Sequence, residues 1–540
     1  MPARDGREDV DGCLEMTRTI WALMGLGVLV RLVRYALDFP LWSDEAFVAA
    51  NFLNKGYLEL LRPLDYGQIC PVLFLWAERA SVGVLGFSEW SLRLFPLICG
   101  VASLGLFRVA AGKVARGAPL MLAVGVFAVS APTIRYASEV KPYASDLLAA
   151  LLLVTPALGW LQDRERAWRL WALTPLAPLA MAMSHPAVFV AGGVGIGLAW
   201  AVFKTGRRRA IAAFLIFNVA TAASFLVLYL MIMRPQDAAM PERLRGYWVD
   251  AFPPLGDPLA LGRWLVQTHT GRMLGYPGGG ARGGSTGTLL LMTGGAWVLW
   301  RERRRSALGL LLAPFGLTMV AAAVHKYPYG GEARHMQYVA PAACLLAGIG
   351  AGALIGAIRR PRVRLLAARV VVAGLFVGGA ASIAQFVNRP YIGPYDVKAR
   401  DFARRFWVDQ ARDAEVACLM GDFGVYERQW FNLYSAFYLC NRAIYSPRTG
   451  KTRRWEAVSE AHPLRCVLYQ GTPPEHPEVA AWLKTMTTTG GYELRRTEKL
   501  DLEMREPGTR SNLEHIVIFE FVPKRGKAIA ALQPPGFLRR

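Results

Sequence analysis

Long apolar runs separated by short polar segments make up most of the first 385 residues of the chain. Each run is roughly 15–25 residues long, close to the ~20 residues that a helix needs to cross the hydrocarbon core of a bilayer. The runs lie at residues 19–37, 90–107, 118–134, 143–161, 170–184, 186–203, 210–233, 286–300, 306–324, 336–358 and 363–385. The pattern predicts about eleven transmembrane helices.

A further apolar stretch, PVLFLWAERASVGVLG at 71–86, carries Glu78 and Arg79 in its middle. Charged side chains are costly at the centre of a bilayer. We therefore expect this stretch to form a helix that lies in the membrane interface.

From about residue 386 the composition becomes that of a soluble domain. VKARDFARRFWVDQARD and PEVAAWLKTMTT have helical periodicity, whereas VACLM, RCVLYQ and HIVIFEFV are typical of short buried strands. The alternation predicts a small α/β domain without a glycine-rich phosphate loop or a catalytic triad. The predicted organisation is an N-terminal segment at 1–17, a transmembrane domain at 18–385 and a soluble domain at 386–540.

Composition supports a membrane protein. Of the 540 residues, 54% are hydrophobic and only 19% are charged, with a net charge of +22. In a soluble protein this charge would suggest nucleic acid, but here the basic residues concentrate in every second loop, which the positive-inside rule places in the cytoplasm. These residues are Arg108, Lys113 and Arg116; Arg164, Arg166 and Arg169; Lys204 and Arg207–Arg209; Arg301 and Arg303–Arg305; and Arg359, Arg360, Arg362 and Arg364.

The same rule fixes the expected orientation in the inner (plasma) membrane. The acid-rich start of the chain differs from a signal peptide, so we expect an uncleaved first helix with a cytoplasmic N-terminus. The soluble domain is then extracytoplasmic. The seven cysteines show no metal-binding spacing, although Cys418, Cys440 and Cys466 could include one disulfide outside the cell.

Candidate chemistry concentrates in the loops predicted to lie outside. In LWSDEAFVAA, residues 41–50, Asp44 and Glu45 are adjacent carboxylates at a membrane boundary. Ser43 or Asp44 could simply cap a helix. Alternatively, one carboxylate could accept a proton from an attacking hydroxyl while its neighbour orients it, or the pair could bind a divalent ion.

Two more outside loops carry cations. RYASEVKPYASD at 135–146 contains Arg135, Glu139, Lys141, Tyr143 and Asp146. This cluster could form a cationic and phenolic cradle for a phosphate, although Arg135 and Lys141 could also only snorkel to the interface.

The other loop, HKYPYGGEARH at 325–335, places Lys326, Arg334 and His335 around a Pro-Gly turn that would let the backbone approach a ligand. Its basic residues could equally contact only lipid headgroups. His185, between two spans, is more typical of a helix end than of a ligand.

Several of these stretches together resemble the GT-C class of polytopic glycosyltransferases, specifically the dolichyl-phosphate-mannose protein mannosyltransferase and lipid A aminoarabinose transferase group. The matching stretches are WSDEAFVAA, PLDYGQICPVLFLWAERASVGVLGFSEWSLRLFPLICG, RYASEVKPYASDLLAALLL and YPYGGEARHMQYVAPA. The segment that opens the second span in that family is matched by Gly86, Ser88, Glu89, Arg93, Leu94 and Pro96. The resemblance covers residues 18–385 as architecture and is most specific over 40–145.

The resemblance implies transfer of a hexosyl or pentosyl group from a polyprenyl-phosphate donor to an extracytoplasmic acceptor, which could be a lipid, a polysaccharide or a protein. Asp44 matches the family's first-loop catalytic acid and Glu45 its neighbour. Lys141 and Arg334 resemble positions that contact the donor phosphate, with Arg135 as a third cation and Glu139, Tyr143, His335 and Lys326 in support. The resemblance implies no certain cofactor, and a divalent metal held by Asp44 and Glu45 stays an open alternative. The soluble domain does not match the family's sugar-binding domains, which leaves the acceptor open.

Two other classes of protein are compatible with a polytopic chain. A transporter or flippase of lipid-linked sugars would have its site near the midplane, often with internal repeats, and this sequence shows neither repeats nor mid-span carboxylates. A scaffold that only displays the soluble domain would leave the loop charges without a role.

Overall fold

The computed structural model describes residues 6–49, 51–240, 246–390, 397, 400, 415–420, 459–461, 463–469, 477–504 and 512–524. These residues belong to two compact units. The first contains Met1–Asp38 and Gly56–Pro390, and the second contains Phe39–Lys55 and Tyr391–Arg540. The segment with Asp44 and Glu45 therefore belongs to the second unit, a division that the sequence gives no reason to expect.

The first unit consists of helices and connecting loops, with no strand among its described residues. Its longer helices are α1 (Gly6–Ala36), α4 (Val72–Leu85), α5 (Glu89–Ala111), α6 (Gly117–Ala128), α8 (Tyr143–Gln162), α9 (Trp168–Met183), α10 (Ala187–Thr205), α11 (Arg208–Leu228), α14 (Pro258–Thr270), α15 (Thr286–Arg301), α16 (Arg305–Ala323), α17 (Ala340–Gly356) and α18 (Pro361–Asn388). Short helical segments are η1 (Glu59–Leu61), η2 (Asp65–Gly67), α7 (Ala131–Arg135), η3 (Tyr136–Ser138), η4 (Tyr229–Met233), α12 (Arg234–Ala238), η5 (Gly246–Ala251), η6 (Arg272–Leu274) and η7 (Ala333–Val339).

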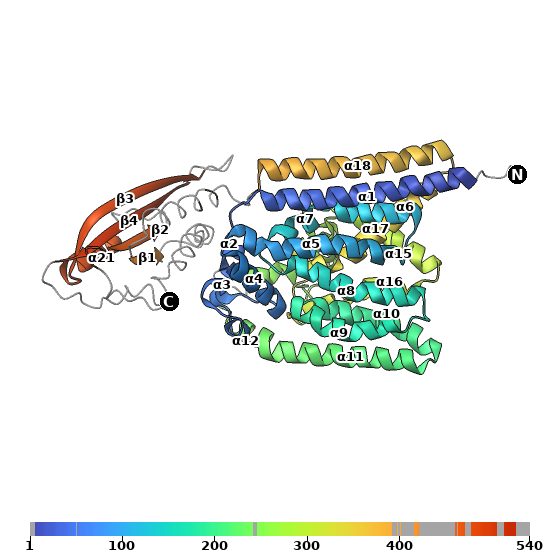
Figure 1. The fold of residues 1–540 in the computed structure, drawn as a ribbon, viewed down its shortest axis with the longest axis horizontal. Helices are drawn as coiled ribbons and strands as arrows, with labels where there is room; N and C mark the ends of the chain where they lie inside the picture. The colour runs from blue at the N-terminus through green and yellow to red at the C-terminus, as the bar shows by residue number, and fades with distance from the viewer. Residues whose placement is uncertain are drawn as a thin grey trace. The chain divides into compact units, whose positions relative to one another are not determined.

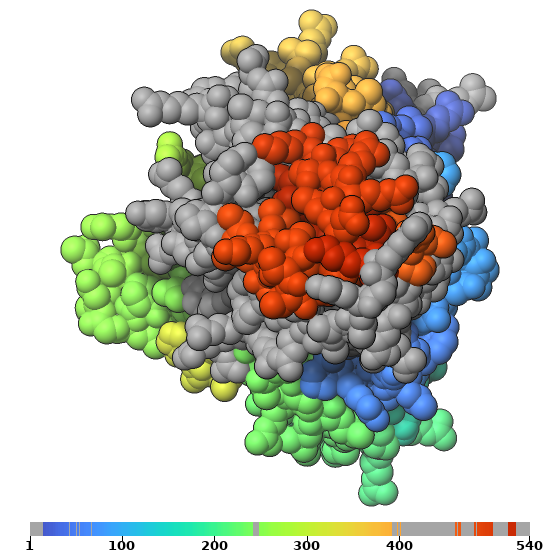
Figure 2. All heavy atoms as spheres, turned by 90° about the vertical axis from the view of Figure 1, so that its left-hand side faces the viewer, coloured from blue at the N-terminus to red at the C-terminus, as the bar shows by residue number. Residues whose placement is uncertain are grey.

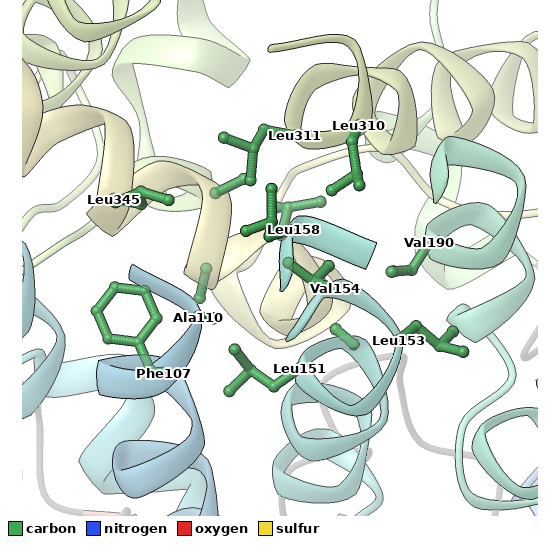
Figure 3. Close-up of a cluster of buried hydrophobic side chains, with 14 of the residues drawn as sticks. Phe107, Ala110, Leu151, Leu153, Val154, Leu158, Val190, Leu310, Leu311 and Leu345 are labelled. Atoms are coloured by element: carbon green, nitrogen blue, oxygen red, sulfur yellow. The ribbon is translucent and has the colours of Figure 1, made fainter. Parts of the chain in front are cut away.

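Most of the long helices lie side by side in a bundle, with α1 and α18 along one edge and α11 along the opposite edge (Figure 1). The bundle is held by an apolar core to which α5, α8, α10, α16 and α17 contribute, including Phe107, Leu151, Val190, Leu310 and Leu345 (Figure 3). The opposite faces of many helices expose large apolar side chains, as expected where lipid replaces water as the solvent.

Glycines bring two of these helices into direct backbone contact. A Cβ atom on Gly295 of α15 would collide with the carbonyl oxygen of Leu346 on α17, and one on Gly350 with the carbonyl oxygen of Leu291. Small residues at helix crossings let membrane helices gain van der Waals contact that the apolar solvent does not otherwise favour.

Each of the predicted apolar runs lies in a helical part of the structure, and the stretch at 71–86 forms α4. By length and composition, eight of the described helices could each cross a membrane, or nine if the bent pair formed by α6 and Ala131–Ser138 counts as one span. Helices α9 and α15 have 16 residues each and fall short of that length. The chain is a multi-pass membrane protein, and the expected number of about eleven spans stays a prediction.

The bend between α6 and α7 is 50°, and a guanidinium fills the break. Arg31 of α1 is fully buried. It donates hydrogen bonds to the carbonyl oxygen of Ala128, which ends α6, at 3.0 Å, to Thr133 Oγ1 at 2.9 Å and to Gly27 O at 2.8 Å. Because the break leaves the last carbonyl groups of α6 without helical partners, Arg31 compensates for it and fixes where the following loop begins.

The second unit contains the short helices α2 (Ser43–Ala49) and α3 (Asn51–Asn54). Its remaining described elements are the strands β1 (Glu415–Met420), β2 (Leu464–Tyr469), β3 (Tyr492–Met504) and β4 (Asn512–Pro523) and the helix α21 (Pro477–Thr488). The strands form one sheet in the order β1-β2-β4-β3, in which β1 and β2 are parallel and the other pairs antiparallel. Its described residues gather into the orange-to-red patch of Figure 2.

The sheet confirms the α/β prediction for the described part of the soluble domain, including the three predicted strands and the helix PEVAAWLKTMTT. Strand β3 was not predicted, because its charged residues hide the alternation that a strand usually shows. The predicted helix VKARDFARRFWVDQARD lies almost entirely outside the described residues, and so does Cys440.

Candidate functional site

The acidic pair Asp44 and Glu45 opens helix α2. Asp44 and Glu45 both lie in its first turn, where carboxylates interact favourably with the helix dipole. Glu45 is fully buried, and its Oε2 accepts a hydrogen bond from the backbone nitrogen of Trp42 at 3.2 Å. Trp42 O also accepts the first helical bond, from Ala46 N. Glu45 therefore makes half of a capping box and has a structural role, whereas Asp44 is half-buried.

The second loop is organised by an ion pair. Arg135, at the end of α7, contacts Glu139 through Nε and Oε1 at 2.7 Å, with the Glu139 side chain 1% exposed and that of Arg135 43% exposed. The Arg135 guanidinium also lies 5.6 Å from the ring centre of Tyr136, whose ring meets that of Tyr143 edge to face. The predicted supporting residues Glu139 and Tyr143 thus shape the loop around Arg135.

Lys141 contacts Gln68, a residue that was not predicted to belong to the site. Its Nζ donates a hydrogen bond of 2.7 Å to Oε1 of Gln68, and both side chains are buried. Just after Gln68, the backbone nitrogen of Cys70 donates to Oε1 of Gln236 on α12 at 3.0 Å. The polar segment before α4 is therefore attached to two distant parts of the chain.

The third loop turns at Gly330 and Gly331, whose φ angles of +74° and +70° favour glycine. Helix η7 follows, and the Arg334 guanidinium lies 5.0 Å from the ring centre of Trp248. His335 is buried and packs its ring against the same tryptophan at 4.2 Å. Trp248 was also not predicted. It lies in the long segment between α12 and α14, and nothing in that segment indicates which of its aromatic residues contacts residues 325–335.

Additional contacts tie this loop to the segment around α14. Arg272 forms an ion pair with Glu332, and His269 Nε2 lies 3.0 Å from the hydroxyl of Tyr329. Lys326, in contrast, is exposed and makes no side-chain hydrogen bond or ion pair within the described residues.

The second and third loops come together. Helix η7 packs against α8 and α7, and the phenol of Tyr136 lies within electrostatic range of Arg135, Glu139, Glu332 and Arg334. The first unit thus has three predicted cations, Arg135, Lys141 and Arg334, in two adjoining loops, and a fourth, Lys326, at an exposed position of the third loop.

His185 lies between α9 and α10, next to Pro186, which caps α10. Burial lowers the pKa of His185 to about 4, so its imidazole is neutral at pH 7. Within the described residues, no group of three or more histidine, cysteine, aspartate or glutamate side chains is arranged to hold a metal ion.

The fold and the loop cluster define a class: a multi-pass helical membrane protein that collects cationic side chains in the loops between its helices. No known protein family matches the sequence, and no curated protein matches it either.

Among solved structures, the chain is similar to ArnT from Cupriavidus metallidurans in the apo state, with 13% identity, coverage of 93% of this chain and 98% of ArnT, and a TM-score of 0.51. It is similarly related to the structure of the same protein bound to undecaprenyl phosphate, with 13% identity, coverage of 92% and 97%, and a TM-score of 0.50. The chain therefore shares the fold of ArnT.

Proposed function

We propose that the protein is a membrane glycosyltransferase that moves a hexosyl or pentosyl group from a polyprenyl-phosphate donor to an extracytoplasmic acceptor. The observation that carries the proposal is the fold, which is similar over 93% of the chain to ArnT, a protein whose structure is also known bound to undecaprenyl phosphate. The cations gathered in the second and third loops support it, because a lipid phosphate is an anion.

In the proposed reaction an acceptor hydroxyl attacks the anomeric carbon of the sugar. The bond from that carbon to the phosphate oxygen breaks, and polyprenyl phosphate leaves with the electron pair. Asp44 takes the proton of the attacking hydroxyl as general base. Lys141, Arg334 and Arg135 stabilise the charge on the leaving phosphate, which needs no proton because it is already a good leaving group. Attack from the opposite face inverts the anomeric carbon.

The remaining roles follow from the residue types. Glu139 and Tyr143 shape the second loop and His335 the third, and Lys326 can contact the donor only from an exposed position. If a divalent ion takes part, Asp44 and Glu45 are the residues that would hold it. The basic loops support an inner-membrane location with a cytoplasmic N-terminus, residues 18–385 as the catalytic membrane domain and residues 386–540 outside.

The test is covalent transfer of radiolabelled sugar from polyprenyl-phosphate donors to acceptors in membranes that contain the protein, run over several sugars. We expect Asp44→Asn to lower turnover by about 10²–10⁴-fold, the usual contribution of a general base. Glu45→Gln is the matched control: it keeps the oxygen that caps α2 and should retain more activity than Asp44→Asn. Equal turnover of wild type and Asp44→Asn would refute the role of Asp44. Movement of the intact donor across the bilayer without covalent transfer would instead identify a flippase.

A further inference from the structure

Gln68 stands out as a buried neutral residue in direct contact with a proposed phosphate ligand. It follows η2 and is 9% exposed. Its Oε1 accepts the 2.7 Å hydrogen bond from Lys141 Nζ although the two residues are 73 positions apart. The contact therefore joins the segment before α4 to the loop before α8.

The backbone that carries Gln68 is itself held in place. Gln236 is 1% exposed, and its Oε1 accepts the hydrogen bond from Cys70 N. Pro71 then caps α4, and Val72 begins that helix. Gln68 thus lies two residues before Cys70, whose backbone is held by Gln236. This restricts the positions that the amide oxygen of Gln68 can take.

The chemistry of this contact suits a lysine that has to receive an anion. A lysine side chain has a flexible four-carbon stem and three rotatable donors, so a productive position has an entropic cost unless a neighbour fixes it. A carboxylate in the place of Gln68 would add a negative charge that competes with a phosphate for the ammonium. An amide oxygen uses one of the three donors and adds no charge.

We propose that Gln68 is a positioning residue that holds the Lys141 ammonium for the phosphate of the lipid donor. This inference rests on the proposed function for the identity of the ligand, but the contact itself can be tested without any lipid. Gln68 acts through Lys141 and does not take part in the chemical step.

The first measurement is the reactivity of Lys141 itself. Purified wild type and Gln68→Met are reductively methylated with formaldehyde, and the rate at Lys141 is followed by peptide mass spectrometry. Because Gln68→Met removes a hydrogen bond to a charged group, Lys141 should be methylated up to about tenfold faster in Gln68→Met than in wild type. Gln337→Met is the matched control, because Gln337 is also a buried glutamine but bonds to Tyr276 and Ala333. It should leave the Lys141 rate unchanged.

The second measurement is binding of undecaprenyl phosphate, with undecaprenol as the uncharged control. Gln68→Met should weaken binding of the phosphate about tenfold and leave undecaprenol binding unchanged. In the Lys141→Met background the same substitution should have no further effect, because the residues act as a unit. Gln68→Glu keeps the acceptor oxygen, so it should protect Lys141 from methylation while still weakening phosphate binding; this variant also serves if Gln68→Met does not fold.

The outcomes separate the two proposals. Equal methylation of Lys141 in wild type and Gln68→Met would overturn the positioning role, and so would faster methylation of Lys141 in Gln68→Glu than in wild type. So would additive effects of Gln68→Met and Lys141→Met on phosphate binding. Faster methylation of Lys141 in Gln68→Met, together with a wild type that binds neither lipid, would support the positioning contact and refute the proposed ligand.

Discussion

The Arg31→Met substitution tests whether a buried guanidinium holds the break between α6 and α7. Methionine fills a comparable apolar volume but cannot donate a hydrogen bond. Two of the three bonds from Arg31 reach across to other segments, at Ala128 O and Thr133 Oγ1. The hydroxyl of Thr133 keeps contacts with Phe127 O and Ser130 O, so the carbonyl of Ala128 is the group most affected.

The magnitude follows from those two bonds. A hydrogen bond to a charged group contributes about 1.5–3 kcal/mol, so two contribute about 3–6 kcal/mol. Removing a buried cation also removes its desolvation penalty, which offsets part of the loss. We therefore expect a net loss of about 2–4 kcal/mol. At about 2 °C per kcal/mol for a large domain, the Tm should fall by at least about 4 °C.

Thermal unfolding in detergent can be followed with a thiol-reactive dye, because Cys70, Cys99 and Cys344 are buried thiols. Arg18→Met is the matched control, since Arg18 lies on the same helix and is exposed. Arg31→Lys, which keeps the charge but loses the planar fork of donors, should give an intermediate Tm. A Tm for Arg31→Met within about 1 °C of that of Arg18→Met would refute the bracing role, since it corresponds to less than about 1 kcal/mol.

Two further predictions concern stability. Burial lowers the pKa of His185 from 6.5 to about 4. As the pH falls, the unfolded chain therefore takes up this proton before the folded protein does. The free energy of unfolding should decrease between pH 6.5 and pH 4 by up to about 3 kcal/mol. The Tm of wild type, followed by tryptophan fluorescence, should fall more between pH 7 and pH 4.5 than that of His185→Gln, and parallel pH profiles would contradict this. Gly295→Ala should lower the Tm, because its Cβ would collide with the carbonyl oxygen of Leu346. The control is Gly287→Ala on the same helix, whose Cβ would meet no atom within 4 Å and which should keep or raise the Tm. Equal Tm values for the two variants would show that α15 and α17 separate at little cost.

The apolar pattern predicted most helices of the membrane unit because lipid requires long uninterrupted apolar segments. It predicted less well where a helix breaks. The run at 118–134 reads as one span, but the structure divides it into α6 and α7. The compensating residue, Arg31, is 97 positions from Ala128 in the chain, and no local pattern in the sequence connects them.

The candidate site shows the same limit. Arg135 and Glu139 could be read as a pair from the sequence because they are four positions apart. The partners of Lys141 and Arg334 could not, because Gln68 and Trp248 are single uncharged residues in loops that show no periodicity. Residue type indicates which side chains can do chemistry. The tertiary fold decides which neighbours hold them.

The three cations of the adjoining loops are held by three different kinds of neighbour. Arg135 contacts a buried carboxylate, Lys141 contacts an amide oxygen, and Arg334 lies over an aromatic ring. An incoming phosphate would have to compete with Glu139 for Arg135, whereas Gln68 and Trp248 bring no negative charge of their own. The Arg135–Glu139 pair is therefore better suited to fixing the shape of the loop between α7 and α8.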